Sequence, residues 1–304
     1  MSTLPIGAQL AAPAAWRGNI HGRTQGVPRQ FIWIFLIACL AWLPLGAAER
    51  VISLAPSLTE MICAIGAADQ LVGRTSACDY PPEPLKAVPV IGGFGAPSLE
   101  KLVALQPTLI VDIALEDEAL GGQIKRLGLR RERIICRTLD DIPAALRRLG
   151  SLLHREVAAE ALATQLTAGI AAARQAATAQ KNKPLVYAEF WRDPPMTCGK
   201  KTFLAELITL AAGENLGDAA ARDYFPVSAE WVVARRPDIV LCLYMADEKK
   251  LPEQMASRPG WNTLPAVRNK HVYGGFDNNL LLRPGPRALE GLRLLQNCFQ
   301  AATR

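Results

Sequence analysis

Short apolar runs alternate with amphipathic segments along most of the chain, and this pattern predicts strands and helices in turn. Residues 50–54 and 71–73 are predicted strands. Residues 58–65 are a predicted helix, which Ser57 caps and Gly66 ends.

One segment occurs twice, 130 positions apart. The first copy matches the second at five residues: Ser98, Glu100, Val103, Ala104 and Pro107 correspond to Ser228, Glu230, Val233, Ala234 and Pro237. Each copy predicts a short helix, at 98–105 and 228–235, and then an apolar strand, at 108–112 and 238–242. The repeat indicates two lobes of similar construction.

An Ala-rich stretch, 152–180, separates the two copies. It contains no proline and predicts one helix about 40 Å long. A helix that connects the lobes is the favoured interpretation, and an ordinary surface helix is the alternative. The remaining predicted elements are helices near 117–127, from 140, and at 202–211, 248–257 and 286–300, strands at 133–136, 185–190 and 271–273, and loops at 191–196 and 274–277.

These elements predict an α/β fold with two Rossmann-like lobes joined by a single long backbone helix. The predicted boundaries are 49–151 for the first lobe, 152–181 for the connecting helix and 182–304 for the second lobe.

The first 48 residues have the pattern of a secretory signal peptide. Residues 1–30 carry three arginines and no acidic residue, residues 31–45 are apolar apart from Pro44, and small residues follow before Glu49. We expect removal of 1–48 and export. A retained membrane anchor, lipid anchoring at Cys39 and a true start at Val27 are the alternatives.

Charge and cysteine spacing exclude two kinds of site. Without the three arginines of the leader, the formal net charge falls from +6 to +3, and no Lys/Arg block remains to follow nucleic-acid phosphates. The seven cysteines show no C-x-x-C spacing, so we expect no metal site. Cys63, Cys136 and Cys242 are predicted to be small buried hydrophobes, while disulfide pairing stays open.

The sequence shows none of the common catalytic motifs. It has no G-x-S-x-G, H-E-x-x-H, P-loop or G-x-G-x-x-G pattern. After the leader, the histidines are His154, expected to be solvated on the long helix, and His271, expected to be structural. The chain is therefore not expected to be an enzyme, and an exported α/β enzyme is a distant alternative.

Aromatic residues gather in the loops predicted at the strand ends, although they make up only 6% of the chain. Open α/β sheets bind ligands beyond the carboxyl ends of their strands. The pattern predicts a site for a large flat or macrocyclic ligand, with Asp277 and Arg283 at its polar edge. Phe225 and Phe276 are expected to pack beneath the loops. The loop residues are Tyr80, Phe94, Trp191, Met196, Tyr224, Phe225, Phe276, Asp277 and Arg283.

The chain resembles the periplasmic binding proteins of ABC importers for cobalamin, iron–siderophore and haem. The resemblance covers about residues 50–300. It is carried by 50–60 (RVISLAPSLTE), 79–82 (DYPP), both repeat copies, 194–200 (PPMTCGK) and 213–215 (GEN). The DYPP and PPMTCGK segments look most like the cobalamin-binding branch.

The resemblance implies a monomer that binds cobalamin in a cleft between the lobes and delivers it to an inner-membrane permease with its ATPase. It needs no intrinsic cofactor. The implied ligand-binding residues are Tyr80, Phe94, Trp191, Tyr224, Asp277 and Arg283. Phe94 and Tyr224 stand where the cobalamin receptors have tryptophans. A ferric-siderophore or haem receptor is therefore the alternative.

The resemblance also gives the repeat a role. Members of the family dock on the permease through one acidic residue in each lobe, and Glu100 and Glu230 occupy the matching positions. Alternatively, each glutamate only stabilises the dipole of its own helix.

Overall fold

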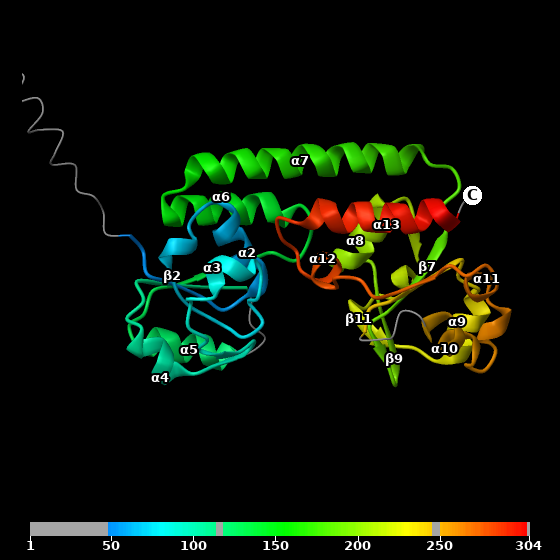
Figure 1. Cartoon of the computed structure of the whole chain (residues 1–304), viewed down its shortest axis with the longest axis horizontal. Coiled ribbons are helices and arrows are strands. Elements are labelled where there is room, and N and C mark those ends of the chain that lie inside the picture. Colours follow the sequence, from blue (N-terminus) through cyan, green and yellow to red (C-terminus); the bar gives the residue numbers. More distant parts are fainter. Residues whose placement is uncertain (1–47, 114–117, 245–249, 303–304) are drawn as a thin grey trace, which may run out of the picture. The chain divides into compact units, whose positions relative to one another are not determined.

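The computed structural model describes residues 48–113, 118–244 and 250–302 (Figure 1). The predicted leader, with Val27 and Cys39, lies outside these residues except for Ala48. Within the described part of the chain, no helix is both long and apolar enough to cross a membrane.

Two four-stranded parallel sheets have the same strand order. In each, the second strand along the chain lies at one edge, followed by the first, the third and the fourth. The first sheet contains β2 (Leu71–Arg74), β1 (Val51–Ser53), β5 (Leu109–Asp112) and β6 (Arg131–Arg133). The second contains β10 (Glu214–Asn215), β7 (Leu185–Glu189), β12 (Ile239–Cys242) and β13 (Val272–Tyr273). The predicted α/β class with parallel sheets is confirmed.

Two small antiparallel sheets lie among the connections. The larger consists of β11 (Tyr224–Pro226), β9 (Pro195–Cys198) and β8 (Trp191–Arg192). The smaller pairs β3 (Gly92–Gly93) with β4 (Ala96–Pro97). The prediction of a plain loop at 191–196 was therefore wrong. β8 pairs with β9 to form a hairpin, and β9 also pairs with β11.

Helices cover the sheets and connect their strands (Figure 1). The α-helices are α2 (Pro56–Ala64), α3 (Pro82–Leu85), α4 (Leu99–Ala104), α5 (Glu118–Arg126), α6 (Asp141–Leu153), α7 (Glu156–Ala179), α8 (Phe203–Leu210), α9 (Ala229–Arg235), α10 (Leu251–Ala256), α11 (Pro265–Arg268), α12 (Asn279–Leu282) and α13 (Ala288–Ala302). Short 3-10 turns occupy η1 (Ala68–Gln70), η2 (Leu216–Ala219) and η4 (Trp261–Thr263).

The long helix α7 packs on α6 near its N-terminal end and on α8 and α13 near its C-terminal end, all on the same side (Figure 1). Its buried residues recur at alternating steps of four and three, which places them in one stripe. Most of them are alanines, and small side chains let the neighbouring helices approach closely. The stripe consists of Ala159, Ala163, Leu166, Ile170, Ala173 and Ala177.

One continuous apolar core runs through both halves. Alternate residues of the central strands point into it, as Val51 does from β1 and Val186 from β7. Their neighbours Ile52 and Tyr187 face two separate outer clusters, one for each sheet. The predicted lobe boundaries at 151 and 181 stay predictions, because the two sheets and the long helix α7 share one apolar core.

Three predicted boundaries were wrong for local reasons. Pro56 starts α2 one residue before Ser57, and Ala55 is the N-cap, because proline suits the first helical position. His154 adopts a left-handed conformation with φ 55°, which separates α6 from α7. Pairing with β5 ends β6 at Arg133.

The two repeat copies form the same cap. Ser98 Oγ accepts a hydrogen bond from the Lys101 amide at 3.3 Å, and Ser228 Oγ accepts one from the Trp231 amide at 3.2 Å. The predicted helix starts are confirmed, and Glu100 and Glu230 lie in the first turns of α4 and α9.

We expect Ser98→Ala and Ser228→Ala each to lower the free energy of unfolding by about 1 kcal/mol, since each leaves an amide of the first turn unpaired. Urea denaturation measures the loss. Aspartate at either position should restore most of it, whereas Ser151→Ala, inside α6, should cause none. Equal stability of both cap variants and wild type would contradict a capping role.

Candidate functional site

The loops at the carboxyl ends of the parallel strands supply the predicted ligand-binding residues. Tyr80 follows β2, Trp191 follows β7 and Asp277 follows β13. Four large aromatic side chains in these loops and in the small antiparallel sheet beside them are between 40% and 59% exposed, although aromatic residues are normally mostly covered. They are Tyr80, Phe94, Trp191 and Tyr224.

Two arginines and three carboxylates form a network between the two halves of the chain. Arg287 holds Glu60 of α2 through two hydrogen bonds, of 2.9 and 3.0 Å, and Asp277 through one of 3.0 Å. Arg283 contacts Asp79 at 2.7 Å and Glu60 at 3.5 Å. We call these five residues the bridging network.

The bridging network also holds Tyr80. The guanidinium carbon of Arg287 lies 3.6 Å from the centre of the Tyr80 ring, which is a cation–π contact. Partial burial acts to raise the pKa of Asp79, but the hydrogen bond and charge of Arg283, a backbone hydrogen bond and the charge of Arg287 together outweigh burial and hold this pKa below its usual range. Tyr80, Asp277 and Arg283 are thus brought together.

The other predicted residues lie on separate features. Trp191 begins the β8–β9 hairpin, and Tyr224 packs edge-on against Phe190 with ring centres 5.3 Å apart. Phe94 lies between β3 and β4. A cavity of about 470 Å³ borders the hairpin, lined by Phe190, Trp191, Arg192, Leu243, Tyr244 and Asn278.

A buried ion pair contacts Tyr244, one of the residues that line this cavity. Arg258 binds both carboxylate oxygens of Glu189, at 2.7 and 2.8 Å, and donates to the Tyr244 hydroxyl at 2.9 Å. The Tyr187 hydroxyl donates to Glu189 at 3.1 Å. Burial, together with the Glu189 carboxylate, raises the pKa of the Tyr187 hydroxyl. Tyr244 is therefore fixed in the cavity wall.

The two glutamates of the repeat are exposed, one in each half. Figure 1 shows α4 and α9 on the side of their sheets away from α7. A hydrogen bond to its own backbone amide and one from Ser228 lower the pKa of Glu230, so its carboxylate stays ionised at neutral pH.

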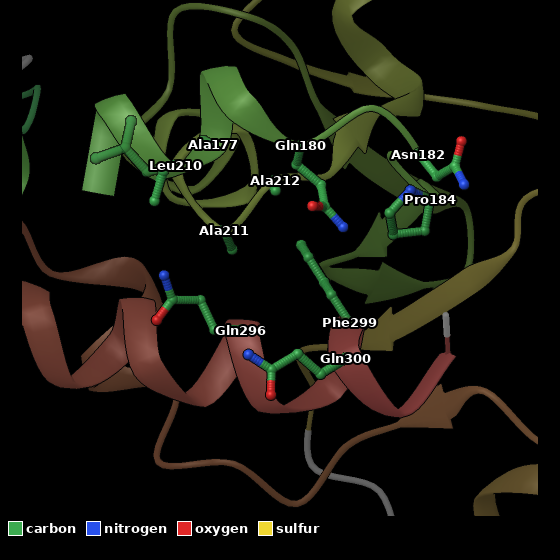
Figure 2. Close-up of a pocket in the computed structure, with 11 residues that line it drawn as sticks. Ala177, Gln180, Asn182, Pro184, Leu210, Ala211, Ala212, Gln296, Phe299 and Gln300 are labelled. Carbon is green, nitrogen blue, oxygen red and sulfur yellow. The ribbon is translucent and has the colours of Figure 1, made fainter. Parts of the chain in front are cut away.

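A second cavity lies away from these loops. It has a volume of about 230 Å³, and Figure 2 shows it between the ends of α7 and α8 and the helix α13. Gln180, Gln296 and Gln300 line it together with Phe299 and small apolar residues. Because none of the exposed aromatic residues borders this cavity, it is not the predicted ligand site.

The described residues contain no cluster of three or more His, Cys, Asp or Glu side chains that could hold a metal ion. His154 is exposed between α6 and α7, not on the long helix as predicted, and His271 precedes β13. Six cysteines are free thiols in the described ranges, and Cys63 is only half-buried, contrary to the prediction. Burial raises the pKa of the Cys242 thiol to about 11, which keeps it protonated.

Some important residues carried no recognisable sequence signal. Glu60 stands out only as the last residue of the segment 50–60 (RVISLAPSLTE). Glu189 lies in the apolar strand β7. Its partner Arg258 is 69 positions further along the chain, just after the end of α10. Phe225 is buried and Phe276 packs against the core, as predicted.

Comparison with known proteins agrees with this arrangement. A vitamin B12-binding protein of Pectobacterium atrosepticum is 31% identical over 261 residues, covering 84% of this chain and 88% of that protein. The apo form of the periplasmic haem-binding protein RhuT from Roseiflexus sp. RS-1 is 30% identical, with a TM-score of 0.75, and covers 85% of this chain and 100% of its own.

The vitamin B12-binding protein BtuF of Vibrio cholerae has the same fold. Its TM-score is 0.74 at 24% identity, and the match covers 84% of this chain and 98% of that one. The family model described as periplasmic binding protein matches residues 51–277. The chain therefore belongs to the periplasmic binding protein family.

Proposed function

We propose that this chain is the solute-binding component of an ABC importer and carries a corrinoid, with cobalamin as the first candidate. The observation that carries the proposal is the set of exposed aromatic residues Tyr80, Phe94, Trp191 and Tyr224 around the ends of both sheets. Relatives that bind vitamin B12 support the choice of ligand.

The physical chemistry of the loops fits a large, mostly apolar ring system. Exposed aromatic faces lose unfavourable contact with water when such a ring packs on them. The hydroxyl groups of the tyrosines and the polar groups of the bridging network can hydrogen-bond to its rim. Binding needs no covalent step, and the shared core favours a small hinge motion.

The proposal includes export and docking. Residues 1–48 would direct the chain to the periplasm, with lipid anchoring at Cys39 as the alternative. Glu100 and Glu230 would then meet arginines of an inner-membrane permease, whose ATPase drives uptake. Exposed ion pairs contribute only about 0–1 kcal/mol each, so their main effect would be on orientation and encounter rate. This chain would act as a monomer.

A haem receptor is the second candidate. The 30% identity with RhuT favours it, and haem iron accepts a tyrosine ligand, a role that Tyr80 or Tyr224 could fill. His271 is less suitable, because it lies at the amino end of β13, opposite the ligand loops. A ferric-siderophore receptor is weaker still, since the two arginines of the network already bind carboxylates.

Calorimetric titration of residues 49–304 with cyanocobalamin tests the proposal. We expect saturable one-to-one binding, and we expect Trp191→Ala to weaken it about tenfold or more, since a tryptophan that the ligand covers contributes strongly to affinity. Val157→Ala, an exposed change on α7, is the matched control and should have no effect. Absence of binding at high micromolar concentration, with haem binding instead, would rule out the corrinoid.

A further inference from the structure

The bridging network has an uneven distribution of charge between its buried and exposed parts. The side chains of Arg287 and Arg283 are only 11% and 17% exposed, and that of Glu60 only 3%. The side chains of Asp79 and Asp277 are 56% and 44% exposed. The network therefore presents carboxylate oxygens to its surroundings and keeps its cations behind them.

The arginines have little capacity left for a further anion. Arg287 uses three N–H groups on Glu60 and Asp277, and the Tyr80 ring covers one face of its guanidinium. Arg74, the next cation along the Asp79 loop, directs its guanidinium at the carbonyls of Cys78 and Val88. With three carboxylates and two guanidinium groups, the network carries a formal charge of −1.

We infer that the bridging network selects a ligand whose rim carries carboxamides and rejects the same ring system with carboxylates. The inference rests on the proposed function and specifies the ligand class for that site. A carboxamide N–H can donate to the exposed oxygens of Asp79 and Asp277. A carboxylate would be repelled by them, or would have to displace Glu60 from Arg287 and leave a buried charge unpaired.

The two candidate ligand classes differ in this property. Cobalamin and cobinamide carry carboxamide side chains around the corrin ring, whereas haem carries propionates. The charge of the network therefore favours the corrinoid, independently of the aromatic residues.

Two corrins with the same ring test the inference. Dicyanocobinamide carries amides where dicyanocobyrinic acid carries carboxylic acids, and both can be titrated calorimetrically into residues 49–304 at pH 7.5. We expect the amide to bind at least thirtyfold more tightly. Asp277→Asn should reduce this ratio at least fivefold, mainly because the acid then binds more tightly.

Glu156→Gln is the matched control. Glu156 is exposed in the first turn of α7, away from the ligand loops, so this variant makes the same change in net charge and should keep the ratio of wild type. Glu60→Gln offers a second variant within the network, used after circular dichroism shows that it folds. The partly exposed Asp277 keeps the test valid if Glu60→Gln does not fold.

The titrations distinguish a failure of the inferred selectivity from a failure of the proposed corrinoid-carrier function. Equal affinity for both corrins, or an unchanged ratio in Asp277→Asn, overturns the inference and leaves a corrinoid carrier standing. Binding of neither corrin, with haem bound instead, overturns both. A ratio that falls equally in Glu156→Gln and Asp277→Asn also overturns the inference, because it would show an effect of net charge alone.

Discussion

Glu189→Ala is expected to lower the free energy of unfolding by about 3–5 kcal/mol, the largest stability loss that we predict. The side chain of Glu189 is fully buried and that of Arg258 is 15% exposed, so the variant leaves a guanidinium without its bidentate partner. It also removes the acceptor of the Tyr187 hydroxyl. Guanidinium denaturation followed by circular dichroism measures the change.

A pair with the same chemistry on the surface provides the control. Arg147 binds both oxygens of Glu160 at 2.7 and 2.9 Å, but both side chains are exposed. Glu160→Ala should leave the denaturation midpoint almost unchanged, because water solvates the freed arginine. If both alanine variants have the same midpoint as wild type, burial does not determine the strength of the Glu189 pair.

Reversing both glutamates of the repeat, by Glu100→Arg and Glu230→Arg, is expected to abolish uptake of the ligand by whole cells. The affinity of the purified protein for the ligand should stay unchanged, because both residues lie in the first turns of peripheral helices. Under the proposed docking role, each reversal would replace attraction to a permease arginine by repulsion, which strongly disfavours association.

The control reverses two other exposed glutamates in first turns, Glu156 of α7 and Glu253 of α10. If the dipole of each helix were all that mattered, both double variants would behave alike. Uptake that survives Glu100→Arg with Glu230→Arg would exclude the docking role, whereas loss of ligand affinity in that variant would place these residues in the binding site instead.

The repeat was the part of the sequence that predicted the structure best. Its two copies give the same cap, the same helix and the third strand of each sheet, because capping and apolar periodicity act over a few residues. The predictions at Ser57 and His154 also rested on a few neighbouring residues, but they were wrong. Pro56 takes the first helical position, which leaves Ala55 at the N-cap that a serine usually occupies, and His154 adopts a left-handed backbone conformation that glycine favours most.

The bridging network could not be predicted from the sequence, for a different reason. Arg287 and Glu60 are 227 positions apart, and Arg283 and Asp79 are 204 apart. Nothing in the local pattern around a lone charged residue identifies a partner at that distance. The sequence could place Tyr80, Asp277 and Arg283 in loops, but only the folded chain shows that Arg287 holds the first two.

The shared core has a consequence for how the chain responds to its ligand. Because Ala159, Ala163 and Ala173 of α7 belong to one apolar cluster with strands of both sheets, neither half can open without exposing apolar side chains of the other. Ligand bound at the loops should therefore slow amide hydrogen exchange in β1 and in β7 by the same factor. Under the proposed function, a permease would recognise the loaded form by this uniform gain in rigidity, without a large closure of the lobes.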